Sequence, residues 1–121
     1  MVGPGTVNRG SIMELEYWVL AFYPPQSEPV VAGVLVFAPN RSSVYLRVRD
    51  QWSAIVTPED AEVLDGYAQM LVEYALDLGA EGFAQLLEES LSGSVRILHQ
   101  DRLTSADVPS ALDTLYKQYV E

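Results

Sequence analysis

The residues best suited to binding chemistry are arginines in and around the third apolar run of the chain. Tyr45, Arg47 and Arg49 occupy every second position, so an extended backbone places them on one face of a strand. Arg41 precedes them, and Arg96 lies in a later run that could form a neighbouring strand. Arginine forks bind carboxylates and phosphates, and a nearby aromatic ring can stack on a base or another ring. The pattern predicts a site for a small anionic ligand or an acidic partner surface.

The same arginines could instead pair with carboxylates of the protein itself. The chain has 17 Asp and Glu residues against 7 Lys and Arg residues, which gives a net charge of -10. Internal carboxylates are therefore plentiful, although exposed ion pairs of this kind contribute little stability. This composition favours internal pairing and leaves the anion site as an alternative.

Two residues are candidates for an acid or a base. His99 is the one histidine, and Asp101 follows at a spacing that puts both on one face of a strand. A serine such as Ser94 would have to complete a nucleophilic triad, but the chain has no Gly-x-Ser-x-Gly elbow. Glu28 is the second candidate, as an acid or base beside an anionic substrate. Neither pattern establishes catalysis, so we expect no catalytic residue.

No sequence pattern indicates a cofactor or a metal. The chain has no cysteine, which excludes disulfides, thiol catalysis and cysteine-bound zinc. Glu59, Asp60 and Glu62 belong to an expected first helical turn, where the helix dipole favours acidic residues, and their spacing matches no EF-hand loop. We therefore expect no cofactor and no metal ligand.

Three apolar runs must position these candidate residues. They span 17–23, 30–38 and 44–48, and the segments between them are rich in Pro and polar residues, which predicts a β-meander. The first two runs are apolar on both faces, so their strands should be central and covered on both sides. The third run alternates between apolar and polar residues, so one of its faces should meet water. Gly33 indicates a bulge or a close approach by another backbone.

The rest of the chain predicts helices and one more strand. Thr57 should cap a helix that has Pro58 at its first position, and Gly79 should end it. A shorter helix, a strand over 95–99 and a last helix should follow. The order β-β-β-α-α-β-α predicts an α+β domain, with a mainly antiparallel sheet of about four strands packed with three helices. The buried stripe of the first helix should comprise Leu64, Tyr67, Leu71, Tyr74 and Leu78.

Length and charge set the broad class of protein. The 121 residues suit one domain, which we assign to residues 14–121 after a Gly-rich N-terminal tail of residues 1–13. No apolar run reaches the roughly 18 residues of a membrane span, and the start of the chain lacks a signal-peptide pattern, so we expect a cytoplasmic protein without membrane contact. The acidic charge argues against nucleic-acid binding. Lys and Arg are absent between Arg49 and Arg96, which predicts an acidic helical side and a small basic patch on the sheet.

Two motifs lie near the ends of the chain. The first is Tyr17-x-Val19-x-x-x-Tyr23-x-Pro25 followed by Glu28-x-Val30-x-x-Gly33-Val34-Leu35-Val36-Phe37-x-Pro39, and the second is Ala111-Leu112-Asp113-x-Leu115-Tyr116-x-x-Tyr119-Val120. They resemble a family of small bacterial and phage proteins catalogued as a domain of unknown function. Members commonly carry Asn where this chain has Val31. The resemblance implies no activity, but genes of such proteins often lie beside a kinase gene, so it implies a kinase as one partner. That kinase resembles the toxin kinases of bacterial persistence systems.

The aromatic residues of the first two strands leave the oligomeric state open. They are Tyr17, Trp18, Phe22, Tyr23 and Phe37. Core packing is the simplest explanation of this group. One aromatic face could also pack against a second copy of the chain, so a homodimer is the alternative.

The sequence alone establishes no function. The lack of a catalytic pattern and the segregation of charge favour a noncatalytic protein-interaction or regulatory module whose partner is a protein. A binding protein or enzyme for a small anionic ligand, at the face that holds Tyr45, Arg47 and Arg49, is the first alternative. A structural subunit of a phage or bacterial assembly is the second.

Overall fold

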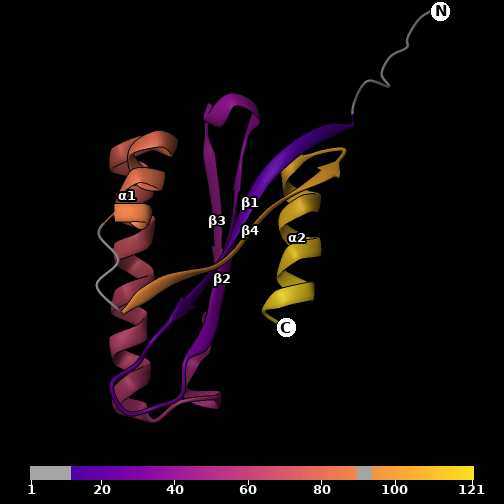
Figure 1. Ribbon diagram of the computed structural model, residues 1–121. Helices are drawn as coiled ribbons and strands as arrows, with labels where there is room; N and C mark the ends of the chain where they lie inside the picture. Colours follow the sequence, from indigo (N-terminus) through magenta and orange to yellow (C-terminus); the bar gives the residue numbers. More distant parts are fainter. Residues whose placement is uncertain (1–11, 90–93) are drawn as a thin grey trace, which may run out of the picture.

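A computed structural model describes residues 12–89 and 94–121, which form a four-stranded sheet between two helices (Figure 1). All neighbouring strands are antiparallel, in the order β3-β2-β1-β4. The strands are β1 (Met13–Phe22), β2 (Val30–Phe37), β3 (Val44–Val48) and β4 (Val95–Ser105), the helices are α1 (Pro58–Glu89) and α2 (Val108–Tyr119), and the 3-10 turns are η2 (Pro39–Arg41) and η3 (Trp52–Ala54). The predicted α+β class and its antiparallel sheet are confirmed.

The expected number of three helices is wrong, because the first two form one helix, α1, with a break at Gly79. Gly79 has φ 71° and ψ -178°, a backbone conformation that residues with a side chain rarely adopt. The helix resumes at Ala80 directly after it. The helix is therefore kinked at Gly79, where the sequence predicted that it would end.

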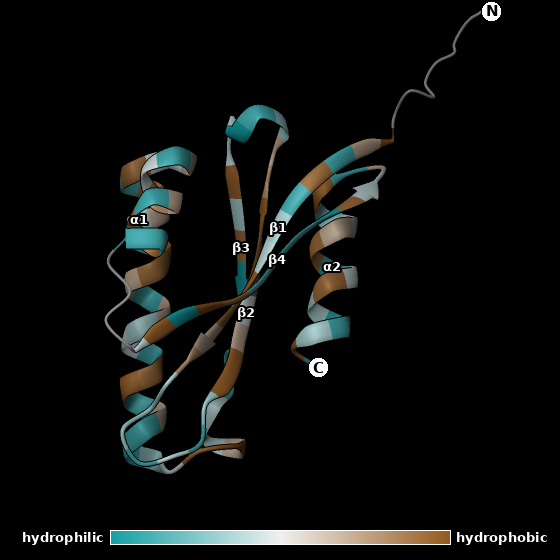
Figure 2. Cartoon of the chain, in the orientation of Figure 1, coloured by the Kyte–Doolittle hydropathy of each residue, from teal (hydrophilic) through white to brown (hydrophobic). Residues whose placement is uncertain are grey.

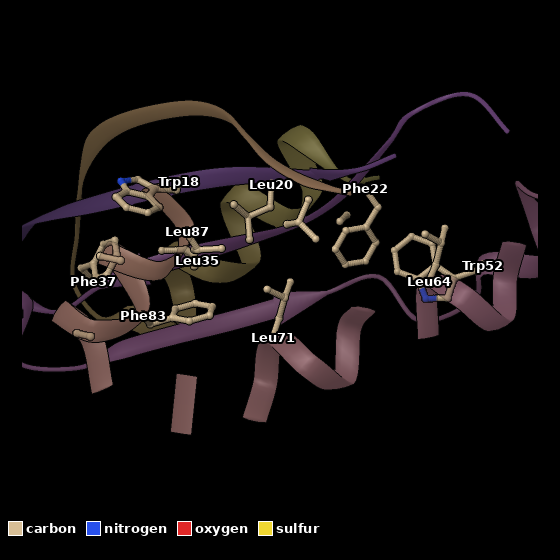
Figure 3. Packing of buried hydrophobic residues seen from close by; sticks show 14 residues of the cluster. Trp18, Leu20, Phe22, Leu35, Phe37, Trp52, Leu64, Leu71, Phe83 and Leu87 are labelled. Atoms are coloured by element: carbon tan, nitrogen blue, oxygen red, sulfur yellow. The ribbon is translucent and has the colours of Figure 1, made fainter. Parts of the chain in front are cut away.

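β1 and β2 lie at the centre of the sheet, and their side chains are buried on both faces. Figure 1 shows α1 and α2 on opposite sides of the sheet. The core on the α1 side includes Trp18, Leu20, Phe22, Leu35, Phe37, Trp52, Leu64, Leu71, Phe83 and Leu87 (Figure 3). The core on the α2 side consists of Leu15, Tyr17, Val19, Val34, Val36, Ala111, Leu115 and Val120. The covering of both faces, predicted from strands without a polar face, is confirmed.

The aromatic residues of the central strands pack inside the monomer. Trp18 meets Phe37 edge to face with ring centroids 5.0 Å apart, and Phe22 lies 5.4 Å from Trp52. Because the two helices cover the sheet, burial of these rings does not require a second copy of the chain. The homodimer stays a prediction.

The start of α1 is fixed by Thr57, as the sequence predicts. The backbone N–H of Asp60 donates to Thr57 Oγ1 at 3.2 Å. The Asp60 side chain is buried, and its Oδ2 accepts hydrogen bonds from Gln26 N at 3.1 Å and Ser27 Oγ at 2.7 Å. This carboxylate therefore ties the loop between β1 and β2 to the first turn of α1.

At Gly33, the backbone of β3 leaves no room for a side chain on β2. A Cβ atom at this position would lie 2.4 Å from the carbonyl oxygen of Arg47 and 2.9 Å from Val48 Cα. The pairing of β1 with β2 also shifts register between Leu20 and Ala21. Both features that Gly33 indicates, a close backbone approach and an irregularity in the sheet, are therefore present.

Some predicted segments fall wholly or partly outside the described residues. The predicted tail of residues 1–13 is one of them, although its last residue, Met13, begins β1. The sequence Ser92-Gly93, which should end the shorter second helix, also lies outside the described residues. Within the described ranges, neither helix has the length and the apolar character that a membrane crossing requires.

Candidate functional site

The predicted arginines do not gather at one site. Arg47 belongs to β3 at one edge of the sheet and Arg96 to β4 at the other. Three inter-strand spacings place these two strands roughly 14 Å apart. Arg41, in η2, lies over aromatic rings of the core on the α1 side. Of the predicted group, Tyr45, Arg47 and Arg49 alone share a face, which is the α2 side of β3.

Arg47 and Arg49 connect β3 to α2. The Arg47 guanidinium carbon lies 4.1 Å from the centre of the Tyr116 ring, and Nη1 lies 3.4 Å from Asp113 Oδ1. Arg49 Nη2 donates to the carbonyl oxygen of Val120, just beyond the end of α2. The contact of Arg47 is the pairing with an internal carboxylate that the charge balance favours, whereas Arg49 contacts a backbone carbonyl.

The remaining predicted binding residues lie apart from one another. Tyr45 pairs with Val36 and is 44% exposed. The Arg96 guanidinium lies 4.9 Å from the centre of the Tyr23 ring. Glu28 is exposed in the loop between β1 and β2. The structure therefore does not bring Glu28 or Arg96 to the arginine face of β3.

His99 and Asp101 share one face of β4, as their spacing predicts. His99 Nε2 lies 3.5 Å from Asp101 Oδ2, and its ring centre lies 5.9 Å from that of Tyr17 and 5.8 Å from that of Tyr119. The two tyrosine hydroxyls form a hydrogen bond of 3.0 Å. Burial, together with this hydrogen bond, raises the pKa of Tyr17 above its ordinary value. The group links α2 to β1 and β4, so these contacts suit packing better than a nucleophilic triad.

The most highly connected polar group joins Arg41 to Glu16, a pair that the sequence analysis did not identify. Arg41 Nε and Nη2 donate to the two carboxylate oxygens of Glu16, each at 3.0 Å. Trp18 Nε1 donates to Glu16 Oε2 at 3.1 Å, and Arg41 Nη1 donates to Glu81 Oε1 at 3.0 Å. The Arg41 guanidinium also lies 4.8 Å from the Phe37 ring centre. The cluster ties η2 to β1 and to the second part of α1.

The backbone of η2 is strained where it carries this arginine. Asn40 has φ 60° and Arg41 has φ 53°, both in the left-handed region. For a residue with a side chain, this conformation costs roughly 1–2 kcal/mol of free energy, and the cost is smaller for Asn than for most residues. The paired hydrogen bonds to Glu16 offset that cost. Glu16 directly precedes the predicted apolar run of residues 17–23, and this acidic residue next to a central strand was the sequence signal for the contact.

A polar crevice of about 550 Å³ opens beside the Arg41–Glu16 pair. Its charged walls comprise Glu14, Glu16 and Glu81 with Arg41 and Arg102. Arg102 Nη1 lies 3.7 Å from Glu14 Oε1, and Arg41 already has two carboxylate partners. The crevice therefore has no excess positive charge with which to hold an anion.

The Arg41–Glu16 pair makes the free energy of unfolding depend on pH. The hydrogen bond from Arg41 holds the pKa of Glu16 below its ordinary value of 4.5. The Arg41–Glu16 pair therefore contributes fully to the free energy of unfolding above pH 4.5. This contribution is lost as the pH falls from 4.5 through the lowered pKa of Glu16. We expect Glu16→Gln to reduce the free energy of unfolding near neutral pH, and the difference from wild type to shrink as the pH falls below 4.5.

Chemical denaturation across this pH range provides the measurement. Glu14→Gln serves as the control, because the Glu14 side chain is 65% exposed and its contact with Arg102 is longer. It should change stability little at any pH. A constant difference between wild type and Glu16→Gln throughout the range would contradict the assignment.

A second hollow, which we call the α1 groove, lies between the end of β3 and α1. It has a volume of about 620 Å³. The groove is lined by Val48, Arg49, Asp50, Asp65, Ala68, Gln69, Val72 and Glu73. An adjoining hollow of about 390 Å³ contacts η3 and shares Asp50 and Asp65 with the groove. The groove is lined by apolar side chains, which we call its floor, and by the carboxylates of Asp50, Asp65 and Glu73, which we call its rim.

The outer surface of α1 exposes more apolar side chains than the predicted stripe allows. Leu64 and Leu71 are buried as expected, but Tyr74 and Leu78 are 40% and 46% exposed. The cause is that small residues such as Ala75 pack against the core and move the buried stripe sideways. Figure 2 shows hydrophobic and hydrophilic segments alternating along α1. The exposed apolar residues of this helix are Met70, Val72, Tyr74, Leu76 and Leu78.

Comparisons with protein-family models, curated proteins and solved structures find no match for this chain. The resemblance to the bacterial and phage family of unknown function therefore stays a prediction. The described residues contain no group of three or more His, Asp or Glu side chains placed to hold a metal ion. Function must be inferred from the surfaces.

Proposed function

We propose that this protein is a noncatalytic interaction module that binds a protein partner through the outer surface of α1. The observation that carries the proposal is a pair of exposed apolar side chains one turn apart on the same side of α1, Val72 and Leu76, which are 46% and 80% exposed. Single exposed apolar residues are common on any surface, but neighbouring apolar side chains that stay exposed are typical of an interaction site.

The charge of α1 supports the same proposal. The chain has no Lys or Arg between Arg49 and Arg96, so every charged side chain on this helix is acidic. A surface of one sign attracts a partner of the opposite sign and repels others, which favours specific association. The partner surface should therefore combine apolar and basic residues.

The contacts of the arginines support an interaction module over an anion-binding protein. Arg41 holds two carboxylates, Arg47 lies between Tyr116 and Asp113, and Arg49 donates to the end of α2. Each of these guanidinium groups has at least one internal contact, although Nε of Arg49 has no hydrogen-bond partner among the described residues. An anionic ligand would have to displace these contacts.

Site-specific photo-crosslinking in the source cells tests this function. A photoreactive amino acid in place of Leu76 should give covalent adducts with a specific protein, because this position lies at the most exposed part of the apolar surface. The same amino acid in place of Thr114, which is exposed on α2 across the sheet, should not. Mass spectrometry then identifies the adduct. A kinase encoded beside the gene, which the family resemblance implies, is one partner that this experiment can identify.

The purified partner allows a second, quantitative step. Leu76→Ser should weaken its binding by about tenfold or more, as expected for an apolar interface residue. Leu98→Ser is the matched control, since Leu98 is half exposed but lies on β4. Equal adducts at positions 76 and 114, or equal binding by the two serine variants, would refute the proposal.

A further inference from the structure

We propose that the α1 groove receives a basic segment of the protein partner, in which lysine or arginine side chains flank an apolar residue. This inference rests on the proposed function and specifies the chemistry of its partner. The groove volume of about 620 Å³ lies within the roughly 300–1,000 Å³ that is typical of binding clefts. It is large enough for side chains of an extended segment.

The floor of the groove supplies the apolar part of the contact. Val48 from β3 and Ala68 and Val72 from α1 line it. Val72 is 46% exposed and also belongs to the apolar surface around Leu76. An apolar side chain in the groove would therefore extend the interface of the proposed function onto the sheet.

The rim of the groove selects positive charge. Asp50, Asp65 and Glu73 contribute carboxylates, and none of them forms an ion pair within residues 12–89 and 94–121. Arg49 also lines the groove, but its Nη2 donates to the carbonyl oxygen of Val120. The carboxylates outnumber this cation, so a Lys or Arg side chain complements the rim. Exposed charges of this kind determine specificity, while the apolar floor provides most of the affinity.

The adjoining hollow contains a buried donor without an acceptor. Trp52 in η3 is 2% exposed, and its Nε1 has no hydrogen-bond partner among the described residues. Trp52 lines the hollow of about 390 Å³ together with Asp50 and Asp65, which also line the groove. Because Trp52 lines a hollow that adjoins the groove, a segment bound there should change the surroundings of its indole ring. The indole fluorescence of Trp52 would then report the event.

A phage-displayed library of random heptapeptides is a suitable probe, because the sequence of the natural segment is not needed. Selection on the wild-type protein should enrich peptides that carry Lys or Arg beside an apolar residue. Selection on the double variant Asp65→Asn and Glu73→Gln should lose this enrichment. The control is the double variant Glu88→Gln and Glu89→Gln, which removes the same amount of charge from α1 outside the groove. Selection on this control should preserve the enrichment.

Peptides from the wild-type selection are then synthesised and titrated. The groove variant should bind them at least about tenfold more weakly than wild type, with unchanged thermal unfolding, and binding should weaken as salt rises. Trp52→Phe should bind them and lose most of the fluorescence change. Enrichment of acidic or uncharged peptides, or none at all, would overturn the inference. So would equal enrichment on the groove variant.

The two proposals can fail separately. If crosslinking at Leu76 captures a partner that binds the Asp65→Asn and Glu73→Gln variant as well as wild type, the groove inference fails and the proposed function stands. If the enriched peptides match a segment of this chain, the occupant is a second copy and not a partner. Light scattering would then show an oligomer that the groove variant abolishes.

Discussion

Replacing Gly33 with alanine is expected to lower the free energy of unfolding by about 3 kcal/mol, the upper part of the usual range for overpacking. The added Cβ would meet the carbonyl oxygen of Arg47 at 2.4 Å and Val48 Cα at 2.9 Å. Both atoms belong to the backbone of β3, so no side-chain rotation can relieve the clash. β3 would have to move away from β2, and the contacts of Arg47 with α2 would weaken with it. Urea denaturation followed by circular dichroism measures the loss.

A second glycine provides the control for this substitution. Gly66 lies within α1, and a Cβ there would meet nothing within 4 Å. Gly66→Ala should raise stability by up to about 1 kcal/mol, because alanine favours the helix more than glycine does. If Gly33→Ala left the stability unchanged, the close approach of β2 and β3 would be incorrect.

Replacing Arg41 with alanine is expected to cost about 2 kcal/mol, since hydrogen bonds to charged groups contribute more than neutral ones. The substitution removes the paired bonds to Glu16 and the bond to Glu81, and leaves a carboxylate that is 24% exposed with only Trp18 as a partner. The strained backbone of η2 remains, because alanine adopts a positive φ no more readily than arginine. Chemical denaturation near neutral pH measures the effect.

Arg47→Ala is the comparison that separates this cluster from an ordinary surface pair. The Arg47–Asp113 contact is 3.4 Å long, with side chains 44% and 51% exposed, so its loss should cost about 1 kcal/mol or less. A double-mutant cycle with Glu16→Gln should show strong coupling for Arg41 and almost none for Arg47. Equal losses for the two arginine variants would contradict the central role of Arg41.

Charged side chains have different partners on the two sides of the sheet. On the α2 side, Arg47 and Lys117 both contact Asp113, and Arg49 donates to the end of the helix. On the α1 side, Arg41 neutralises acidic groups near η2, while the carboxylates that line the α1 groove form no ion pair among the described residues. The acidic helical surface is therefore the face that can attract a basic partner.

The sequence by itself determined the local elements of this protein. Apolar runs bounded by Pro and Asn predicted β1, β2 and β3, and the lack of a polar face in the first two predicted their central position. Thr57 predicted the start of α1, and Gly33 predicted a bulge or a close approach by another backbone. These features depend on neighbouring residues or on the alternation of side chains along a strand, so they are visible without knowledge of the rest of the chain.

Only the tertiary structure decided which residues meet. Arg41 donates hydrogen bonds to Glu16 and Glu81, which lie 25 and 40 positions from it in the chain. No periodic pattern of residues predicts such a pairing. The strand order puts Arg96 and Arg47 at opposite edges of the sheet, although alternation alone allowed them one face. Likewise, helical periodicity indicated an apolar stripe on α1, but packing against the core decided that Ala75 faces inward and Tyr74 meets solvent. Periodicity defines the faces of an element, whereas the long-range packing of the sheet and helices determines what each face contacts.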